Sequence, residues 1–294
     1  MAAPHRSRRI WFSAVAVVLA LGVAAVVTVV ATTPDPEPPA PRATATPTPT
    51  PAPEPVGYPE NTDTYDLAAL PAVDVFSLAG DLAVDDSPTA EPLALVATPR
   101  APGAPLFADP LAAPVGQLPS ELRFDGTTVP VIELQDAWAR VMISGRAGLP
   151  SEGRAGQLTA WVRLADVEIA ETTISVRVSL SEPSITILDG DTVTYETGAF
   201  ALGAAATPTP IGRTFVMTSR VDPNAGFTRG HPVVYLGLQS PTLDGFNGAS
   251  TAITAFHYHD VRTGAVSNGC LRVDAEAIAR LAALPLGTPV TIYP

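Results

Sequence analysis

The residues best suited to chemistry lie near the C-terminus, where two histidines precede the only cysteine of the chain. His257 and His259 stand in the segment FHYHD at 256–260, and Cys270 stands in SNGCLR at 267–272. A thiol is a good nucleophile only as thiolate, and its pKa of about 8.5 falls when a histidine, an arginine or converging backbone N–H groups stand nearby. Because this segment can supply all three, it predicts nucleophilic catalysis by Cys270 with an imidazole as base.

The glycine before the cysteine has a role of its own. Gly269 allows a sharp backbone turn that would expose the sulfur and aim the amides of Gly269 and Cys270 at one point. Two such amides can form an oxyanion hole for a tetrahedral acyl intermediate. The alternative, in which Cys270 is a small buried hydrophobe, leaves the surrounding Ser267, Asn268 and Arg272 unexplained.

The two histidines leave the choice of base open. They alternate on a predicted strand and therefore share one face, so either can reach the sulfur. Imidazole and thiolate also bind zinc, which makes His257, His259, Asp260 and Cys270 an alternative metal set. No Cys-x-x-Cys pair exists, and a Gly-Cys turn suits acyl transfer better than tetrahedral coordination, so we expect no metal and no cofactor.

The motif SNGCLRV, which starts at Ser267, resembles the signature of the L,D-transpeptidases (YkuD-like). That signature is Ser or Thr, His or Asn, Gly-Cys, an apolar residue and Arg, and a strand-borne His precedes it. TPTPIG at 207–212 is similar to the family's TPTPxG loop, and GTPVTI at 287–292 resembles its usual ending. The resemblance covers 173–294 and implies a mainly β, sandwich-like catalytic domain.

The resemblance also implies roles for single residues. Cys270 would be the acylated nucleophile and His257 its base, because Phe256 and the longer spacing match the family better than His259 does. Ser267 would orient the imidazole, Gly269 would complete the turn, and Arg272 would brace the loop.

Three further residues would face the substrate, namely Tyr258, His259 and Asn268. Two departures from the family stand out: Asn268 replaces the commoner second His, and the loop 257–267 is shorter than the family norm.

As a function, the resemblance implies cross-linking of peptidoglycan stem peptides through a Cys270 thioester, with carbapenem-type β-lactams as inhibitors. An L,D-carboxypeptidase using the same site and a non-catalytic wall-binding protein remain the alternatives.

The elements that would position these residues can be read from the pattern. Period-two runs from Thr173 onward predict strands, with a hairpin turn at 189–191. Asp274 can cap one short helix over 275–284. Alternating pieces in 92–172 predict a small β domain that resembles bacterial SH3-like domains of wall proteins, with Trp138 and Trp161 in its core. Residues 65–91 have no clear periodicity and stay unassigned.

The N-terminus predicts an extracytoplasmic location. A basic tail (1–9) precedes an uncharged apolar run (10–31), which is long enough for a transmembrane helix and places the rest of the chain on the cell-wall side. A cleaved signal peptide, which would give a secreted form, is the alternative. Residues 32–64 predict a Pro/Thr-rich linker in extended polyproline II.

The composition excludes one class of partner and one kind of cross-link. The 294 residues are 46% hydrophobic, enough for two modest domains, with a formal net charge of −12 that argues against nucleic acid. With one cysteine, no intramolecular disulfide can form.

Overall fold

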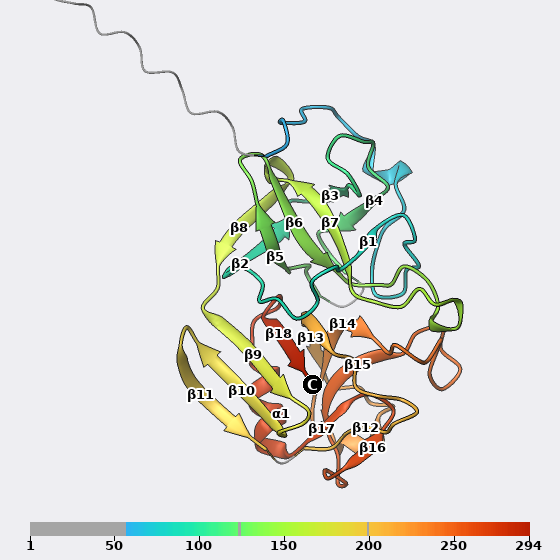
Figure 1. Ribbon diagram of the computed structural model, residues 1–294, viewed down its shortest axis with the longest axis vertical. Coiled ribbons are helices and arrows are strands. Elements are labelled where there is room, and N and C mark those ends of the chain that lie inside the picture. Colours follow the sequence, from blue (N-terminus) through green and yellow to red (C-terminus); the bar gives the residue numbers. More distant parts are fainter. Residues whose placement is uncertain (1–56, 123–124, 199) are drawn as a thin grey trace, which may run out of the picture. The chain divides into compact units, whose positions relative to one another are not determined.

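The computed structural model describes residues 57–122, 125–198 and 200–294 (Figure 1). The predicted tail (1–9), the predicted transmembrane helix (10–31) and most of the linker (32–64) lie outside the described residues. Within the described ranges, no helix has both the length and the apolar character needed to span a bilayer. The described end of the linker is held in place, because the Tyr58 N–H donates to Gln135 Oε1 at 2.8 Å and Trp138 Nε1 donates to the Pro59 carbonyl at 2.9 Å.

The C-terminal half of the chain forms an eight-stranded sheet. Its order is β11 (Thr192–Thr197), β10 (Ser184–Asp189), β9 (Ile174–Ser179), β18 (Pro289–Tyr293), β13 (Gly212–Arg220), β14 (Val233–Gln239), β15 (Ile253–Tyr258) and β17 (Leu271–Val273). The first half of β13 pairs with β18 and the second half pairs with β14. This strand therefore connects the strands β11, β10, β9 and β18 with the strands β14, β15 and β17. The predicted turn at 189–191 is confirmed as the connection between β10 and β11.

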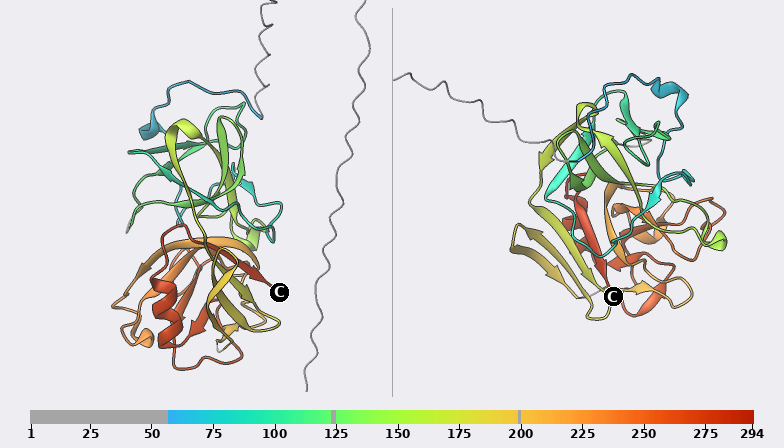
Figure 2. Two further views of the ribbon diagram at one scale, coloured as in Figure 1. Left: turned by 90° about the vertical axis from the view of Figure 1, so that its left-hand side faces the viewer. Right: turned by 45° about the horizontal axis from the view of Figure 1, so that its top comes forward.

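The predicted helix is confirmed as α1 (Ala275–Ala282), which contacts β14 and β15 (Figure 2). Asp274 caps it as expected, because its Oδ1 accepts the Ala277 N–H at 2.8 Å. Ala277, Ile278 and Leu281 are buried, and their spacing places them on the face toward the sheet.

A second, six-stranded sheet precedes the first. Its order is β1 (Ala83–Val84), β7 (Leu158–Arg163), β6 (Trp138–Ile143), β5 (Val129–Leu134), β2 (Leu95–Pro99) and β8 (Val167–Glu171). Trp138 and Trp161 are buried and cluster with Phe107, whose ring meets Trp138 edge to face at 5.0 Å. Their predicted place in the core is confirmed, while the SH3-like resemblance stays a prediction.

The eight-stranded sheet packs with α1 in a buried cluster of its own, and a second cluster joins it to the six-stranded sheet. Phe215 and Met217 of β13 belong to the same buried cluster as Val129 and Val141 of the six-stranded sheet. The unassigned segment 65–91 contributes Val73, Val75 and Leu82 to this cluster. The remaining described elements are the pairs β3 (Gly103–Leu106) with β4 (Gly116–Pro119) and β12 (Leu202–Gly203) with β16 (Ala265–Ser267), and the 3-10 turns η1 (Leu67–Ala69), η2 (Pro150–Glu152), η3 (Leu164–Asp166) and η4 (Gly226–Thr228).

Candidate active site

Cys270 lies on a tight turn between β16 and β17. Gly269 adopts φ 108°, in the left-handed region that favours glycine, which agrees with the sharp turn expected here. Ser267 closes this turn on itself: its hydroxyl donates to the Cys270 carbonyl at 2.6 Å and accepts the Gly269 N–H at 3.1 Å. The Gly269 N–H thus already donates a hydrogen bond to the Ser267 hydroxyl. Its role in an oxyanion hole stays a prediction, and it would require this hydrogen bond to be exchanged.

The TPTPIG loop and the residues just before it are hydrogen-bonded to the turn that carries Cys270. The Thr207 hydroxyl donates to the Ser267 carbonyl at 3.1 Å, and the Ala204 N–H donates to the same oxygen at 2.9 Å. A Cβ added at Gly269 would lie 3.4 Å from the Pro208 carbonyl. The sequence of this loop resembles a family motif, but the contact of Thr207 with the turn that carries Cys270 leaves no local signal in the sequence.

The two histidines reach the same cavity as the cysteine from a neighbouring strand. His257 lies on β15, and His259 follows one residue after the end of this strand. β15 runs parallel to β17, and the register sets His257 beside Arg272. A cavity of about 550 Å³ lies here. It is lined by Asp222, Asn224, Ala225, Phe227, Val233, Tyr235, Phe246, Asn247, Ala252, Ile253, Ala255, His257, His259, Ser267, Asn268, Cys270 and Arg272.

The hydrogen bond of His257 fixes which of its nitrogens can act as a base. Nδ1 lies 2.9 Å from the Tyr258 carbonyl oxygen, which can only accept, so in the neutral ring Nδ1 carries the hydrogen and Nε2 keeps its lone pair. Burial lowers the pKa of His257 to about 4, against the opposing hydrogen bond to Tyr258, and the charge of Arg272 lowers it further. His257 is therefore neutral at physiological pH.

His259 has the opposite tautomer. Its Nδ1 accepts the Val261 N–H at 2.9 Å, so the neutral ring carries its hydrogen on Nε2 and offers a donor there. Burial and the charge of Arg272 lower the pKa of His259 as well. The ring of Phe227 covers both histidines, with centroids 5.0 Å from His257 and 6.0 Å from His259. Phe227 belongs to η4, and no sequence motif around it predicts a place at the site.

The thiol differs from the expectation. Burial raises the pKa of Cys270, and the hydrogen bond from the Ala255 amide and the charge of Arg272 offset this only in part. The Cys270 sulfur also lies 3.8 Å from the Ile253 carbonyl, to which the S–H donates. The expected lowering of the thiol pKa is therefore wrong. Desolvation outweighs the positive neighbour, and the resting pair is a neutral thiol beside a neutral imidazole.

This resting state predicts the pH dependence of Cys270 alkylation. Iodoacetamide reacts with thiolates, so the rate for Cys270 should keep rising beyond the pH at which an ordinary thiol, with a pKa of about 8.5, levels off. The measurement is the pseudo-first-order alkylation rate, followed by intact mass from pH 6 to 10, with N-acetylcysteine as reference. A plateau already reached below pH 7 would show a thiolate–imidazolium ion pair instead.

The other predicted residues divide between the cavity and its surroundings. His259, Asn268 and Arg272 line the cavity, and Nε of Arg272 is buried without a hydrogen-bond partner among the described residues. Ser267 makes its hydrogen bonds within the Cys270 turn, while the imidazole of His257 is oriented by the Tyr258 carbonyl. The Tyr258 side chain is not brought to the cavity: its hydroxyl donates to Asp260 at 3.0 Å, and its ring lies against His231.

One wall of the catalytic cavity is a loop that is hydrogen-bonded to Arg146, which follows β6 of the six-stranded sheet. The loop 240–252 supplies Phe246, Asn247 and Ala252 to the lining. Arg146, which is 2% exposed, donates to the carbonyls of Leu243 and Asp244 and, at 3.1 Å, of Ser250 in this loop. Among the described residues no group of three or more His, Cys, Asp or Glu side chains could hold a metal ion.

The fold and the cavity define a mainly β domain with a cysteine and a neutral histidine on one cavity, an arrangement suited to acyl transfer. Residues 173–292 match the family model "YkuD: L,D-transpeptidase catalytic domain". This segment therefore belongs to the L,D-transpeptidase catalytic domain family. A comparison with curated protein sequences found no match.

Three solved structures illustrate the distant structural likeness. The catalytic domain of an Enterococcus faecium L,D-transpeptidase is 20% identical, with 41% of this chain and 96% of that chain covered and a TM-score of 0.28. L,D-transpeptidase 3 from Mycobacterium tuberculosis, in complex with a faropenem-derived adduct, is 15% identical, with 54% and 92% covered and a TM-score of 0.32. A fused Zn-dependent amidase/peptidase/peptidoglycan-binding domain-containing protein from Clostridium acetobutylicum is 24% identical, with 42% of this chain covered and a TM-score of 0.29. This chain spans only about half, 52%, of the clostridial protein.

Proposed function

We propose that the protein is a peptidoglycan L,D-transpeptidase that cross-links stem peptides through a thioester on Cys270. One observation carries this proposal: Cys270 and a neutral His257 with a free Nε2 line the same cavity, inside the segment that matches the family. The tautomers support His257 rather than His259 as the base, because the Nδ1 lone pair of His259 is already used and its Nε2 carries the hydrogen.

In the first step, Cys270 attacks the carbonyl carbon at the L-to-D junction of a donor tetrapeptide. The thiol proton passes to His257 Nε2 as the S–C bond forms, and the imidazolium then gives this proton to the leaving amine as the C–N bond breaks. The products are a thioester and the free terminal D-residue. A neutral resting pair suits this sequence, since charge is created only while the bond forms.

In the second step, an amine of a neighbouring stem resolves the thioester. An ammonium group in water first loses one proton to the solvent, and the resulting amine attacks the thioester carbon. Its second proton passes through His257 Nε2 to the departing Cys270 sulfur, which regenerates the thiol. Arg272 would stabilise the negative charge that develops on sulfur and oxygen, a role supported by its position in the cavity lining and by its charge, which favours the thiolate of Cys270.

We extend the proposal to location. The basic tail and the apolar run at 10–31 would anchor the chain in the cell membrane with the described domains on the wall side, where stem peptides are found.

A carbapenem tests the reaction directly. Because a strained β-lactam carbonyl is an acyl donor, incubation with imipenem should add the mass of one carbapenem to the protein, and Cys270→Ala should remain unmodified. Intact-protein mass spectrometry gives the answer. No adduct on the natural protein, or an equal adduct on Cys270→Ala, would contradict the proposed nucleophile and leave a non-catalytic wall-binding protein.

A tetrapeptide-containing muropeptide then separates transfer from hydrolysis. We expect cross-linked dimers among the products. If tripeptide and free D-residue form without any dimer, the same site belongs to an L,D-carboxypeptidase.

A further inference from the structure

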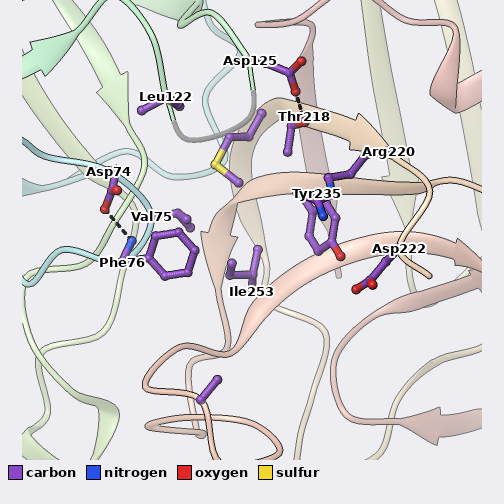
Figure 3. A pocket seen from close by; sticks show the side chains of 12 residues that line it. Asp74, Val75, Phe76, Leu122, Asp125, Thr218, Arg220, Asp222, Tyr235 and Ile253 are labelled. Carbon is purple, nitrogen blue, oxygen red and sulfur yellow. Dashed lines mark hydrogen bonds between the residues drawn. The ribbon is translucent and has the colours of Figure 1, made fainter. Parts of the chain in front are cut away.

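Figure 3 shows the lining of a second cavity, of about 370 Å³, which shares residues with the catalytic cavity. Its lining comes from both sheet regions, because Phe76 and Leu122 precede the eight-stranded sheet, while Met217 and Tyr235 belong to it. The complete lining is Asp74, Val75, Phe76, Leu122, Asp125, Met217, Thr218, Arg220, Asp222, Tyr235, Ala249 and Ile253.

The two cavities meet at three shared residues, Asp222, Tyr235 and Ile253. Ile253 reaches the nucleophile, since its carbonyl accepts the Cys270 S–H at 3.8 Å. Tyr235 is close enough to respond to the charge of Asp222 and, when it forms, to that of a Cys270 thiolate. Burial, followed by the charge of Asp222, raises the pKa of Tyr235, so its hydroxyl stays protonated at the junction. A ligand that extends from the second cavity to this junction would therefore approach the sulfur.

The lining combines apolar side chains with carboxylates. Asp74, Asp125 and Asp222 surround an apolar surface that includes Phe76 and Met217, against one basic lining residue, Arg220. Asp222 Oδ1 accepts one N–H, from Asn224 at 2.9 Å, and Asp125 Oδ2 accepts the Thr218 hydroxyl. A carboxylate has about four lone-pair sites, so each of these two groups has room for a further donor.

We propose that this second cavity binds the acceptor, by an aliphatic chain that ends in a primary ammonium group. The inference rests on the proposed function, and it makes the region before residue 173 part of the substrate site. The methylene chain lies against the apolar surface, and the carboxylates attract the ammonium group, which reaches Asp222 at the junction and loses a proton to the solvent before it attacks the thioester. The donor peptide occupies the larger catalytic cavity. Both volumes lie in the range of roughly 300–1,000 Å³ that is typical of small-molecule sites.

The test uses the full chain and Nα-acetyl-L-lysine amide as the acceptor probe, with a tetrapeptide donor. Phe76→Ala and Asp125→Asn change residues that line the second cavity alone, and Glu168→Gln removes an exposed carboxylate that lines neither cavity. We expect Phe76→Ala and Asp125→Asn each to raise KM for the probe roughly tenfold. In Phe76→Ala and Asp125→Asn, the rate of Cys270 acylation by the donor should change by less than about twofold. In Glu168→Gln, KM for the probe should also change by less than about twofold.

A direct binding measurement keeps this inference separate from the reaction. The probe is titrated into Cys270→Ala with and without the Phe76→Ala and Asp125→Asn changes, with Nα-acetyl-norleucine amide as the probe that lacks the ammonium group. We expect the lysine probe to bind more tightly than the norleucine probe, and only where both side chains are intact. Equal binding of the two probes, or an unchanged dissociation constant in the double variant, would overturn the acceptor site even if Cys270 is acylated. If Cys270 is never acylated, the proposed function fails, and the titration still decides whether the cavity holds an ammonium chain.

Discussion

Replacing His257 by glutamine is expected to slow the acylation of Cys270 by a carbapenem about 10²- to 10⁴-fold, because the thiol then loses its general base. The thiol needs such a base, since burial raises its pKa and leaves little thiolate at neutral pH. Glutamine keeps much of the volume of the ring and can still donate to the Tyr258 carbonyl, so the packing beside Phe227 is largely retained. The measurement is the second-order rate of adduct formation, followed by intact mass.

His259→Gln is the matched control. It changes an imidazole on the same cavity whose Nε2 carries the hydrogen, so we expect it to slow acylation less than tenfold. If His259→Gln slowed the acylation of Cys270 more than His257→Gln did, His259 would be the general base.

The pH dependence of acylation gives a second check on His257. The base must be neutral to accept a proton, and its pKa is lowered to about 4 by burial. The acid limb of the natural protein should therefore have its midpoint near pH 4, well below the value of about 6.5 for an ordinary histidine. A limb centred near pH 6.5 would show that the group that titrates is not the buried His257.

The local parts of the site could be predicted from the sequence, because their causes are local. The positive φ of Gly269 and the cap of α1 by Asp274 depend on residues only a few positions away. That His257 and His259 face the same cavity was likewise expected from period two, although β15 ends at Tyr258, one residue before His259. The pKa of Cys270 could not be predicted in this way, because its sign depends on how much protein surrounds the sulfur.

The parts that were missed depend on contacts between distant segments. Arg146 bonds to carbonyls 97, 98 and 104 positions later, and a backbone carbonyl leaves no mark in the sequence. Val73 and Val75 are buried in the stretch between η1 and β1, which forms no named strand, so period two does not appear around them. Both features help to form or flank the cavities, which are therefore harder to predict than the nucleophile.

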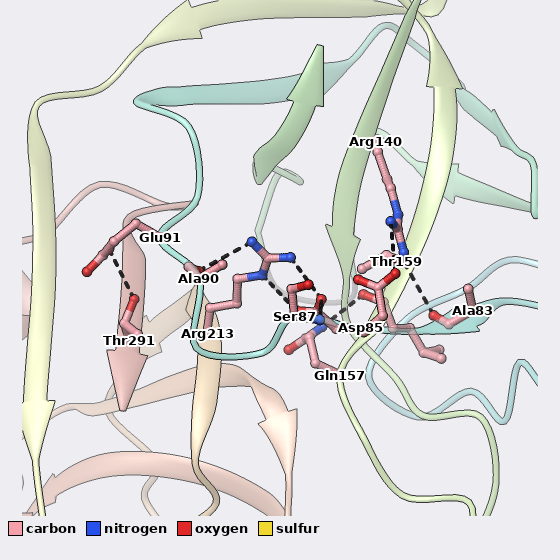
Figure 4. Close-up of polar contacts among 12 residues, drawn as sticks. Ala83, Asp85, Ser87, Ala90, Glu91, Arg140, Gln157, Thr159, Arg213 and Thr291 are labelled. Atoms are coloured by element: carbon pink, nitrogen blue, oxygen red, sulfur yellow. Dashed lines mark hydrogen bonds and ion pairs between the residues drawn. The ribbon is translucent and has the colours of Figure 1, made fainter. Parts of the chain in front are cut away.

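A buried ion pair joins this missed segment to the catalytic sheet (Figure 4). Arg213 of β13 donates two hydrogen bonds to the Asp85 carboxylate, from Nε to Oδ2 at 2.7 Å and from Nη2 to Oδ1 at 2.8 Å. The Asp85 side chain is 1% exposed and that of Arg213 is 6% exposed. Burial opposes the ionisation of Asp85, but the hydrogen bonds from Arg213 and the Ser87 N–H outweigh it, so the pKa of Asp85 lies below its usual value.

Removing one partner of this pair should destabilise the protein more than removing any exposed charge. We expect Asp85→Ala to lower the free energy of unfolding by about 3–5 kcal/mol, because a buried guanidinium is left unpaired. The exposed pair of Arg100 and Glu168 is the control, and Glu168→Gln should cost no more than about 1 kcal/mol. Urea unfolding at pH 7 measures both.

The double replacement and the pH dependence separate an unpaired charge from a packing defect. Asp85→Leu combined with Arg213→Met removes both charges and keeps apolar volume, so it should recover most of the stability lost in Asp85→Ala. Since the pKa of Asp85 is lower in the folded state, its contribution is complete above the unfolded value of about 3.9 and is lost as the pH falls through the folded value. The difference between the natural protein and Asp85→Ala should therefore shrink below about pH 4. A loss that stays constant with pH and is not recovered in the double variant would assign the effect to a cavity at position 85.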